Sequence, residues 1–462
     1  MPNAAEATSV ETPRRTLRIA ALVYVMSALV YVAVLGDRRF ETSPNDHFSH
    51  LAAAWLEGRL DLGGPPPGRN DWACFDRETA SACPPGFAHG GERYRWYVSF
   101  PPFPALVVLP AVALAGGPDG LPDRFFWALL AGLGPALLYR LLARLRREGT
   151  SGRSRRDDLA LTALFAVGSV YFFVAVQGAV WFAAQVVATS LLVLYLDFAS
   201  DARRPWAAGL MLGLLFLTRP TTALLSAFFG YELMRTHRRP EAPALPAEGW
   251  LGRLVAWVRG VDWRAAVPRG LRFSVPMLAA GTLAMLHNAA RFEDPLEFGH
   301  TFLQIRWRER IETWGLFNYH YLAKNLAVFT SSLPWLSAEA PYVKVSGHGL
   351  ALWYTTPPLL MVFFPRRWTA RMIGLAAAVV PVLLLDLAYQ NSGWLQFGYR
   401  FALDYLPALF VLLALGRRRF GPVFGIAMVF AIAVNLFGAI TFDRAMQYYD
   451  VQGSQTRIFQ PD

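Results

Sequence analysis

The sequence contains little charge, few cysteines and almost no lysine. Only 17% of its 462 residues are charged and 54% are hydrophobic. A soluble domain is about a quarter charged and less than half apolar. This shortage of charge excludes intrinsic disorder and a long coiled coil, and a count of two cysteines excludes a disulfide-dense miniprotein. Apolar and aromatic residues are abundant instead, so the composition indicates a protein that is embedded in a membrane.

The basic residues are almost all arginine. The chain carries 44 cations and a formal net charge of +11, and Lys324 and Lys344 are its only lysines. The arginines lie in short clusters between apolar runs, which is typical of cytoplasmic loops and not of a nucleic-acid-binding face. The expected partner is therefore the lipid bilayer, and no nucleic-acid partner is predicted.

Apolar runs approaching the roughly 20 residues needed to cross a bilayer recur along the chain. We predict an all-α polytopic membrane protein with about eleven transmembrane helices in a single domain, residues 19–441. Residues 1–18 are predicted to lie in the cytoplasm because arginines precede the first span, and residues 442–462 form an extracytoplasmic tail. No small-residue cleavage site follows the first span, which indicates an uncleaved signal anchor. The predicted spans are 19–36, 125–143, 159–176, 181–199, a hairpin of two within 207–234, 273–289, 350–364, 372–388, 405–416 and 423–440.

One further apolar run, residues 100–116, is not counted as a span. It is short and holds four prolines, and counting it would place the arginine-rich segment 144–156 outside the cell. We predict that it forms a helix at the outer face or a re-entrant segment. It then belongs to one large extracytoplasmic loop, residues 37–123.

Two further outer loops, 290–348 and 389–404, and one long cytoplasmic loop, 235–272, complete the predicted topology. The cytoplasmic loop holds eight arginines and a tryptophan-bearing segment that is typical of an interfacial helix. Seven of the eight histidines fall on or near the outer side. We therefore expect the chemistry on that side.

Both cysteines, Cys74 and Cys83, lie in the first outer loop. An oxidising compartment would allow them to close a small loop, and no histidine stands beside either of them to favour a metal. We predict a disulfide, with two free thiols as the alternative.

The segment "ETSPNDHFSHLAAAWLEGRLDL" after the first span has apolar residues at helical spacing and predicts an amphipathic helix on the outer membrane surface. Asp46 stands at its start. Two interpretations of this residue stay open: it caps the helix, or it is a general base at the boundary of water and lipid. His47 and His50 are candidate substrate-binding residues. A divalent cation held by these two histidines and Asp46 is the disfavoured alternative, and no cofactor is predicted.

Charged residues beside apolar runs are candidates for an anion site, because they are costly there. Arg219 lies at the tip of the predicted hairpin, and Arg400 lies just before the tenth span with Asp404 one turn later. A lipid-linked phosphate would need such cations at the outer interface. In the alternative interpretation Arg400 and Asp404 only pair with each other at positions i and i+4.

Five features along residues 17–441 together resemble the bacterial integral-membrane glycosyltransferases of the GT-C fold class, which includes the protein mannosyltransferases and the aminoarabinose transferases of lipid A. They are the acidic residue that opens a surface helix after the first span, "WYVSFPPFPALVVLP", "GLLFLTRPT", "LHNAARFEDPLEFGH" and "QFGYRFALDYLP". The resemblance implies a GT-C-like helix bundle with juxtamembrane helices in its first outer loop.

The same resemblance implies an activity. It is the transfer of a sugar from a polyprenyl-phosphate donor to a glycan, lipid or protein acceptor of the cell envelope, on the extracytoplasmic face of the plasma (inner) membrane. Asp46 matches the catalytic carboxylate of the first outer loop in this class and would act as the base of an inverting transfer. Outer-face arginines would contact the donor phosphate.

This chain departs from the pattern at the turn between the third and fourth spans. Many members of the class carry a second acidic residue there, whereas this chain reads "VAVQGAVWFAAQ". Gln177 is predicted either to hydrogen-bond a sugar hydroxyl or to form the turn with Gly178. Two other function classes stay open: a flippase or transporter of lipid-linked sugars, and an envelope polysaccharide polymerase or ligase.

Overall fold

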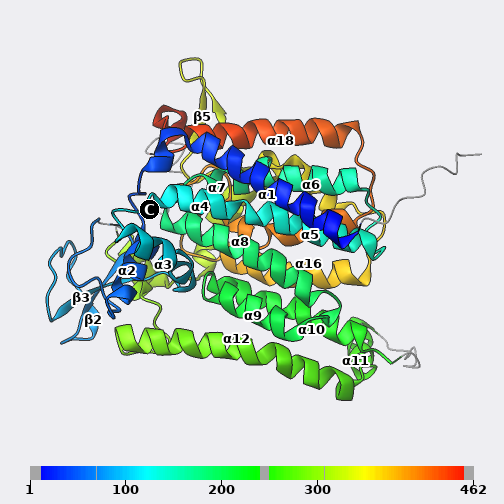
Figure 1. The fold of residues 1–462 in the computed structure, drawn as a ribbon, viewed down its shortest axis with the longest axis horizontal. Helices are drawn as coiled ribbons and strands as arrows, with labels where there is room; N and C mark the ends of the chain where they lie inside the picture. The colour runs from blue at the N-terminus through cyan, green and yellow to red at the C-terminus, as the bar shows by residue number, and fades with distance from the viewer. Residues whose placement is uncertain (1–11, 69, 240–248, 306, 452–462) are drawn as a thin grey trace, which may run out of the picture.

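The computed structural model describes residues 12–68, 70–239, 249–305 and 307–451, and its long helices run side by side in one bundle (Figure 1). The helices longer than ten residues are α1 (Pro13–Leu35), α3 (Phe103–Ala115), α5 (Leu133–Arg147), α6 (Arg155–Val167), α8 (Val180–Ala199), α9 (Pro205–Phe216), α10 (Ser226–Thr236), α11 (Gly249–Arg259), α12 (Trp263–Phe292), α16 (Ala370–Leu387) and α18 (Pro422–Thr441). The shorter helices are α2 (His47–Leu56), α4 (Asp123–Ala131), α7 (Val170–Ala175), α13 (Arg308–Trp314), α14 (Leu322–Ser331), α15 (Leu352–Thr355) and α17 (Leu406–Leu415).

Two small sheets show that the all-α prediction was incomplete. One has the strand order β2-β1-β3 and the other β4-β5-β6, with β5 and β6 parallel. The sequences "WACFD" and "YRWYV" of β1 and β3 are rich in aromatic residues, which suit strands, but they are too short to separate from buried loop by periodicity. The strands are β1 (Trp72–Asp76), β2 (Ser81–Ala82), β3 (Tyr94–Val98), β4 (Trp335–Leu336), β5 (Val343–Ser346) and β6 (Tyr449–Asp450).

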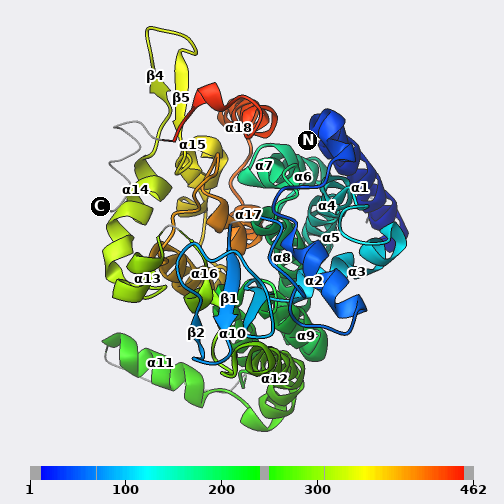
Figure 2. The same cartoon turned by 90° about the vertical axis from the view of Figure 1, so that its left-hand side faces the viewer.

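The two ends of the bundle differ in what they carry. Strands β2, β3 and β5 lie at one end, together with α2 and α3, whereas α11 lies at the opposite end (Figure 1). Figure 2 looks onto the first of these ends and shows β1, β2, α13 and α14 in front of the bundle. We call the end that carries these strands the sheet end. We call the opposite end, where α5 ends and α6 begins, the arginine end. The predicted outer loops and the predicted cytoplasmic loops are thus separated in space.

Among the residues that the structure describes, five helices are long and apolar enough to cross a membrane. They are Pro13–Phe40, Asp123–Arg147, Val180–Ala202, Ala370–Leu387 and Pro422–Thr441. Helices also occupy the other predicted spans, but most of these are shorter or broken, so the predicted count of about eleven is not confirmed. Residues 100–116, predicted to form a helix at the outer face or a re-entrant segment, contain α3. This helix has only 13 residues and packs beside α2 at the sheet end.

Local sequence explains the breaks. Gly168 separates α6 from α7, and the Ser169 hydroxyl then accepts a hydrogen bond from the Tyr171 backbone N–H as the cap of the new helix. Pro220 opens a 3₁₀ turn, Pro220–Leu225, between α9 and α10, because proline has no N–H to continue a helix. The predicted hairpin is therefore present, with Arg219 in extended conformation at its turn.

Helix α8 forms the centre of the bundle. Of the 18 residues in its most apolar stretch, 83% are buried. The corresponding fraction is 28% in α1 and in α18. The exposed residues of these outer helices are apolar, with Leu22 on α1, Leu283 on α12 and Ile426 on α18 among them. An apolar exterior around a packed interior suits a bundle whose surroundings are lipid.

Candidate functional site

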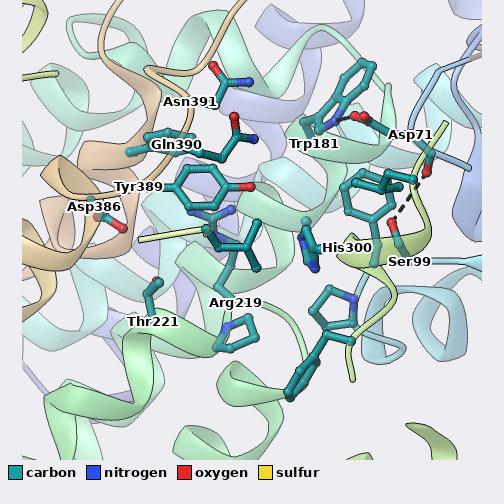
Figure 3. Close-up of a pocket in the computed structure, with 18 of the residues that line it drawn as sticks. Asp71, Ser99, Trp181, Arg219, Thr221, His300, Asp386, Tyr389, Gln390 and Asn391 are labelled. Carbon is teal, nitrogen blue, oxygen red and sulfur yellow. Dashed lines mark hydrogen bonds between the residues drawn. The ribbon is translucent and has the colours of Figure 1, made fainter. Parts of the chain in front are cut away.

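A cavity of about 300 Å³ opens at the sheet end of the bundle. Six separate parts of the chain line it: the segment before β1, the segment after β3, the start of α8, the turn between α9 and α10, residues 298–317, and the end of α16 with the loop that follows it. Most of the wall is apolar, and the polar groups Asp71, Arg219, Asp386 and Tyr389 project from different sides (Figure 3). An apolar pocket with a few convergent polar groups is typical of a ligand site.

Asp71 supplies a carboxylate to the cavity. It directly precedes β1 in a left-handed backbone conformation, with φ of 59°. The indole N–H of Trp181, at the start of α8, donates a hydrogen bond to its Oδ2 at 2.7 Å (Figure 3). Burial raises the pKa of Asp71 to about 6, although the Trp181 hydrogen bond and the charge of Arg400 act in the opposite direction. A carboxylate with this pKa is suited to accept a proton near neutral pH.

Arg219 is held by a carboxylate from the far end of the sequence. Its Nε and Nη2 donate to Asp404 at 3.0 and 2.6 Å, and the hydroxyl of Thr221 donates to the same carboxylate at 3.1 Å. The alternative prediction that Asp404 pairs with Arg400 is therefore wrong. Residues 400–404 form a 3₁₀ turn, so the i, i+4 geometry of an α-helix is absent there, and Asp404 faces the turn between α9 and α10 instead.

Arg400 lies in the cavity wall without a carboxylate partner among the described residues. Its side chain is only 4% exposed. Its Nε donates to the carbonyl of Gly393 at 3.2 Å, and the guanidinium lies 5.0 Å from the centre of the Phe401 ring. Burial, and then the neighbouring charge of Arg219, lower the pKa of Arg400 to about 9. A buried cation of this kind is stabilised by an anion that enters the cavity.

Asp46 and the two nearby histidines lie outside the residues that line this cavity. Asp46 occupies the N-cap position of α2, but its side chain makes no capping hydrogen bond, and its Oδ1 lies 3.3 Å from Nε2 of His50. His47 is fully buried, stacks on Trp72 at 3.8 Å and bonds to the carbonyl of Asn70 at 2.9 Å. His47 therefore packs the interior of the first loop.

Gln177 is also placed away from the cavity lining. Its side-chain amide donates to the carbonyl of Phe173 at 3.3 Å, so it closes the turn before α8. Gly178 has φ of 80°, and a Cβ there would lie 2.7 Å from Arg124. The predicted turn with Gly178 is thus present, and the predicted bond to a sugar hydroxyl stays a prediction.

Cys74 and Cys83 form the predicted disulfide, with Cα atoms 5.5 Å apart. The Cys83 carbonyl accepts hydrogen bonds from Gln304 and Arg308 of the predicted second outer loop, at 3.0 and 3.2 Å. The disulfide therefore stabilises the pair of strands β1 and β2, and the segment that contains Gln304 and Arg308 is hydrogen-bonded to this pair. No group of three histidine, cysteine or acidic side chains in the described part of the chain is arranged to hold a metal ion.

A groove of about 920 Å³ lies beside the disulfide. Its aromatic lining comes from Trp72, Phe87 and Trp96, and its carboxylates come from Glu309 and Glu312 on α13. Ile305 lines both the groove and the cavity, so the two are neighbours.

Sequence reasoning missed most polar residues of the cavity, among them Asp71, Asp386 and Tyr389. Asp71 stands in a loop with no helical or strand pattern, and only its place before an aromatic strand marks it. Asp386 lies at the end of α16, is 2% exposed and has an Oδ2 without a hydrogen-bond partner. Its position inside an apolar run was the available signal. Tyr389 follows in the next loop, where nothing distinguishes it from other tyrosines.

The sequence matches no family model and no curated relative. The chain is structurally similar to ArnT from Cupriavidus metallidurans, solved bound to undecaprenyl phosphate, with 13% identity and a TM-score of 0.47 over 90% of this chain. It is similar to the oligosaccharyltransferase AglB from Archaeoglobus fulgidus, solved with an inhibitory peptide and a dolichol-phosphate, with 12% identity and a TM-score of 0.42 over 95% of this chain. The chain spans 63% of the length of ArnT and 56% of that of AglB. Both of these proteins belong to the GT-C class that the sequence resembles.

Proposed function

We propose that this protein is an integral-membrane glycosyltransferase. Its donor is a sugar linked to a polyprenyl phosphate, its acceptor belongs to the cell envelope, and the transfer takes place at the sheet end, on the extracytoplasmic face, with inversion. The observation that carries the proposal is Arg400, a buried guanidinium in a cavity wall with no carboxylate partner among the described residues.

The cavity provides the two functions that the transfer requires. The acceptor hydroxyl attacks the anomeric carbon of the sugar, the bond between that carbon and the phosphate oxygen breaks, and the pair of electrons leaves with the lipid phosphate. Arg400 and Arg219 stabilise the charge that develops on the phosphate. Because Asp404 already neutralises Arg219, Arg400 contributes most of the uncompensated positive charge.

Asp71 is the proposed general base. A base must lie within hydrogen-bonding reach of the acceptor hydroxyl, and Asp71 lines the cavity that also holds Arg400. Its pKa of about 6 leaves it deprotonated at neutral pH yet able to take the proton. Asp46, which the sequence resemblance favours, pairs with His50 outside this lining and is the competing candidate.

The groove beside the disulfide is the proposed approach for the acceptor. Aromatic faces and carboxylates are the groups that bind the apolar faces and the hydroxyls of sugar rings. Trp72 and Trp96 supply such faces, and Glu309 supplies a carboxylate. A glycan in this groove would reach the cavity past Ile305.

Binding of undecaprenyl phosphate to the purified protein tests the proposal. We expect the wild-type protein to retain the lipid through delipidation and Arg400→Gln to bind it at least about tenfold more weakly, since a charge-assisted bond to phosphate is lost. Arg77→Gln, a substitution of an exposed arginine in the predicted first outer loop, is the matched control. Equal retention by Arg400→Gln and wild type would overturn the donor site.

A product assay separates the transferase from the alternatives. Proteoliposomes that contain the protein and an undecaprenyl-phosphate sugar should release free undecaprenyl phosphate when an envelope extract is added. A flippase would move the donor without cleaving it, and that result would refute the proposed reaction.

A further inference from the structure

A second cavity lies at the arginine end of the bundle, away from the site described above. It has a volume of about 290 Å³ and is enclosed by the first turns of α1, the last turns of α5 and the turn that joins α8 to α9. Half of its lining residues are arginines. They are Arg140, Arg144, Arg147, Arg203 and Arg204.

The acidic residues near this cavity neutralise only part of that charge. Asp197 accepts hydrogen bonds from Arg140 at 2.9 Å and pairs with Arg144 at 2.6 Å. Glu148 pairs with Arg203 at 2.8 Å. Glu148 also lies 3.4 Å from Arg144, and Asp201 lies 3.8 Å from Arg203, so three carboxylates face the five guanidinium groups of the wall.

Two of the arginines have no carboxylate partner among the described residues. Arg147 donates to the hydroxyl of Thr16 at 2.8 Å, and the guanidinium of Arg204 lies 5.5 Å from the centre of the Phe198 ring. A concave site with several uncompensated guanidinium groups attracts an anion. The planar fork of arginine donors matches phosphate oxygens in particular.

The surroundings of the cavity resemble those of a lipid headgroup site. Leu17 of the lining is 58% exposed, and Leu22, further along α1, is 60% exposed. Acyl chains could therefore lie along the outside of α1 while a headgroup occupies the cavity. The volume is at the small end of the range for ligand pockets, about 300–1,000 Å³, which suits a headgroup rather than a whole lipid.

We propose that this cavity binds a phosphate group, and that an anionic phospholipid of the surrounding membrane supplies it. The site is at the end of the bundle opposite to Arg400 and Asp71, so it is independent of the proposed transfer. Occupation would join α1, α5 and the turn between α8 and α9 through one shared anion.

Lipid retention by the full-length protein tests this site. Native mass spectrometry in detergent should show phosphatidylglycerol bound to the wild-type protein. The double variant Arg147→Gln/Arg204→Gln should bind at least about tenfold less of this lipid, because each such cation contributes several-fold to binding. Arg366→Gln/Arg367→Gln, two exposed arginines in the turn before α16, should retain the lipid like wild type. Arg204→Gln alone, in an exposed turn, should lose part of the lipid even if the double variant fails to fold.

Thermal unfolding separates the two sources of phosphate. Phosphatidylglycerol should raise the unfolding temperature of the wild-type protein more than phosphatidylcholine does. The rise caused by phosphatidylglycerol should be smaller in Arg204→Gln. If inorganic phosphate gives the same rise as phosphatidylglycerol, the lipid source is wrong and a soluble phosphate compound is the ligand. If Arg204→Gln and the double variant both retain phosphatidylglycerol like wild type, the site itself is refuted.

Discussion

At the residue scale, the proposed transfer depends on a carboxylate and a guanidinium that line one cavity. Asp71 reaches it from the first outer loop and Arg400 from the loop after α16. Trp181 fixes the Asp71 carboxylate by a hydrogen bond, and Arg400 is held by the Gly393 carbonyl. The Trp181 indole and the Gly393 carbonyl are uncharged, so they hold these two side chains in place without neutralising them. The charges of Asp71 and Arg400 therefore stay available for a reaction.

Asp71→Asn should lower the transfer rate by about two to four orders of magnitude, the usual contribution of a general base. The asparagine keeps the shape and can still accept the Trp181 hydrogen bond, so expression and membrane insertion should not change. Asp46→Asn is the matched comparison and should retain most of the activity. The opposite pattern, with Asp46→Asn inactive and Asp71→Asn active, would restore Asp46 as the base.

The pH dependence of transfer should report the same group. Only the deprotonated carboxylate accepts a proton, so with a pKa of about 6 the active fraction is about 90% at pH 7 and about 10% at pH 5. Activity is therefore expected to fall as the pH drops through about 6. A rate that stays constant from pH 7 to pH 5 would contradict the assignment of Asp71.

At the element scale, the strand pair of the first outer loop supports both the cavity and the groove. Asp71 immediately precedes β1, and Trp72 and Trp96 stand on β1 and β3 and face the groove. The Cys74–Cys83 disulfide joins β1 to the segment after β2, and the Cys83 carbonyl receives two hydrogen bonds from the second loop. The positions of both loops thus depend on one short covalent ring.

Removal of this disulfide should loosen the loops while the helix bundle stays intact. Closing a ring of this size constrains the unfolded loop by roughly 2–3 kcal/mol. Cys74→Ser/Cys83→Ser should therefore be cut faster by protease within residues 72–98 and should show a higher acceptor KM. Lipid binding at the arginine end should not change, and a global loss of folded protein would contradict this local role.

At the scale of the whole molecule, the bundle separates two kinds of surface. The sheet end holds the cavity, the groove and the disulfide, and the arginine end holds the second cavity and the long basic segments. The positive-inside rule predicts that the arginine end lies in the cytoplasm. The proposed reaction then faces the outside, where a disulfide persists.

Thiol labelling in intact cells tests this orientation. Glu92→Cys, whose side chain is fully exposed at the sheet end, should react with a membrane-impermeant maleimide from outside. Arg155→Cys, exposed at the start of α6, should react only after the membrane is permeabilised. Labelling of Arg155→Cys in intact cells would reverse the predicted topology.

The helices and the disulfide could be predicted from the sequence because their signals are local. Long apolar runs, arginine clusters and the pair of cysteines in one loop each depend on residues that are close in the chain. The structure has helical segments within the predicted spans, several of them short or broken, and has the predicted disulfide. The small sheets were missed because their strands are two to five residues long.

The sequence by itself determined that the chain forms an apolar helical bundle, where most of its long helices lie, and which residues carry charge beside apolar runs. Only the tertiary structure decided which of these charges meet. Asp404 bonds to Arg219, 185 positions away, rather than to Arg400, four positions away. Asp71, not Asp46, lines the cavity with Arg400. The physical reason is that hydropathy is a property of neighbouring residues, whereas an ion pair depends on how distant helices pack together.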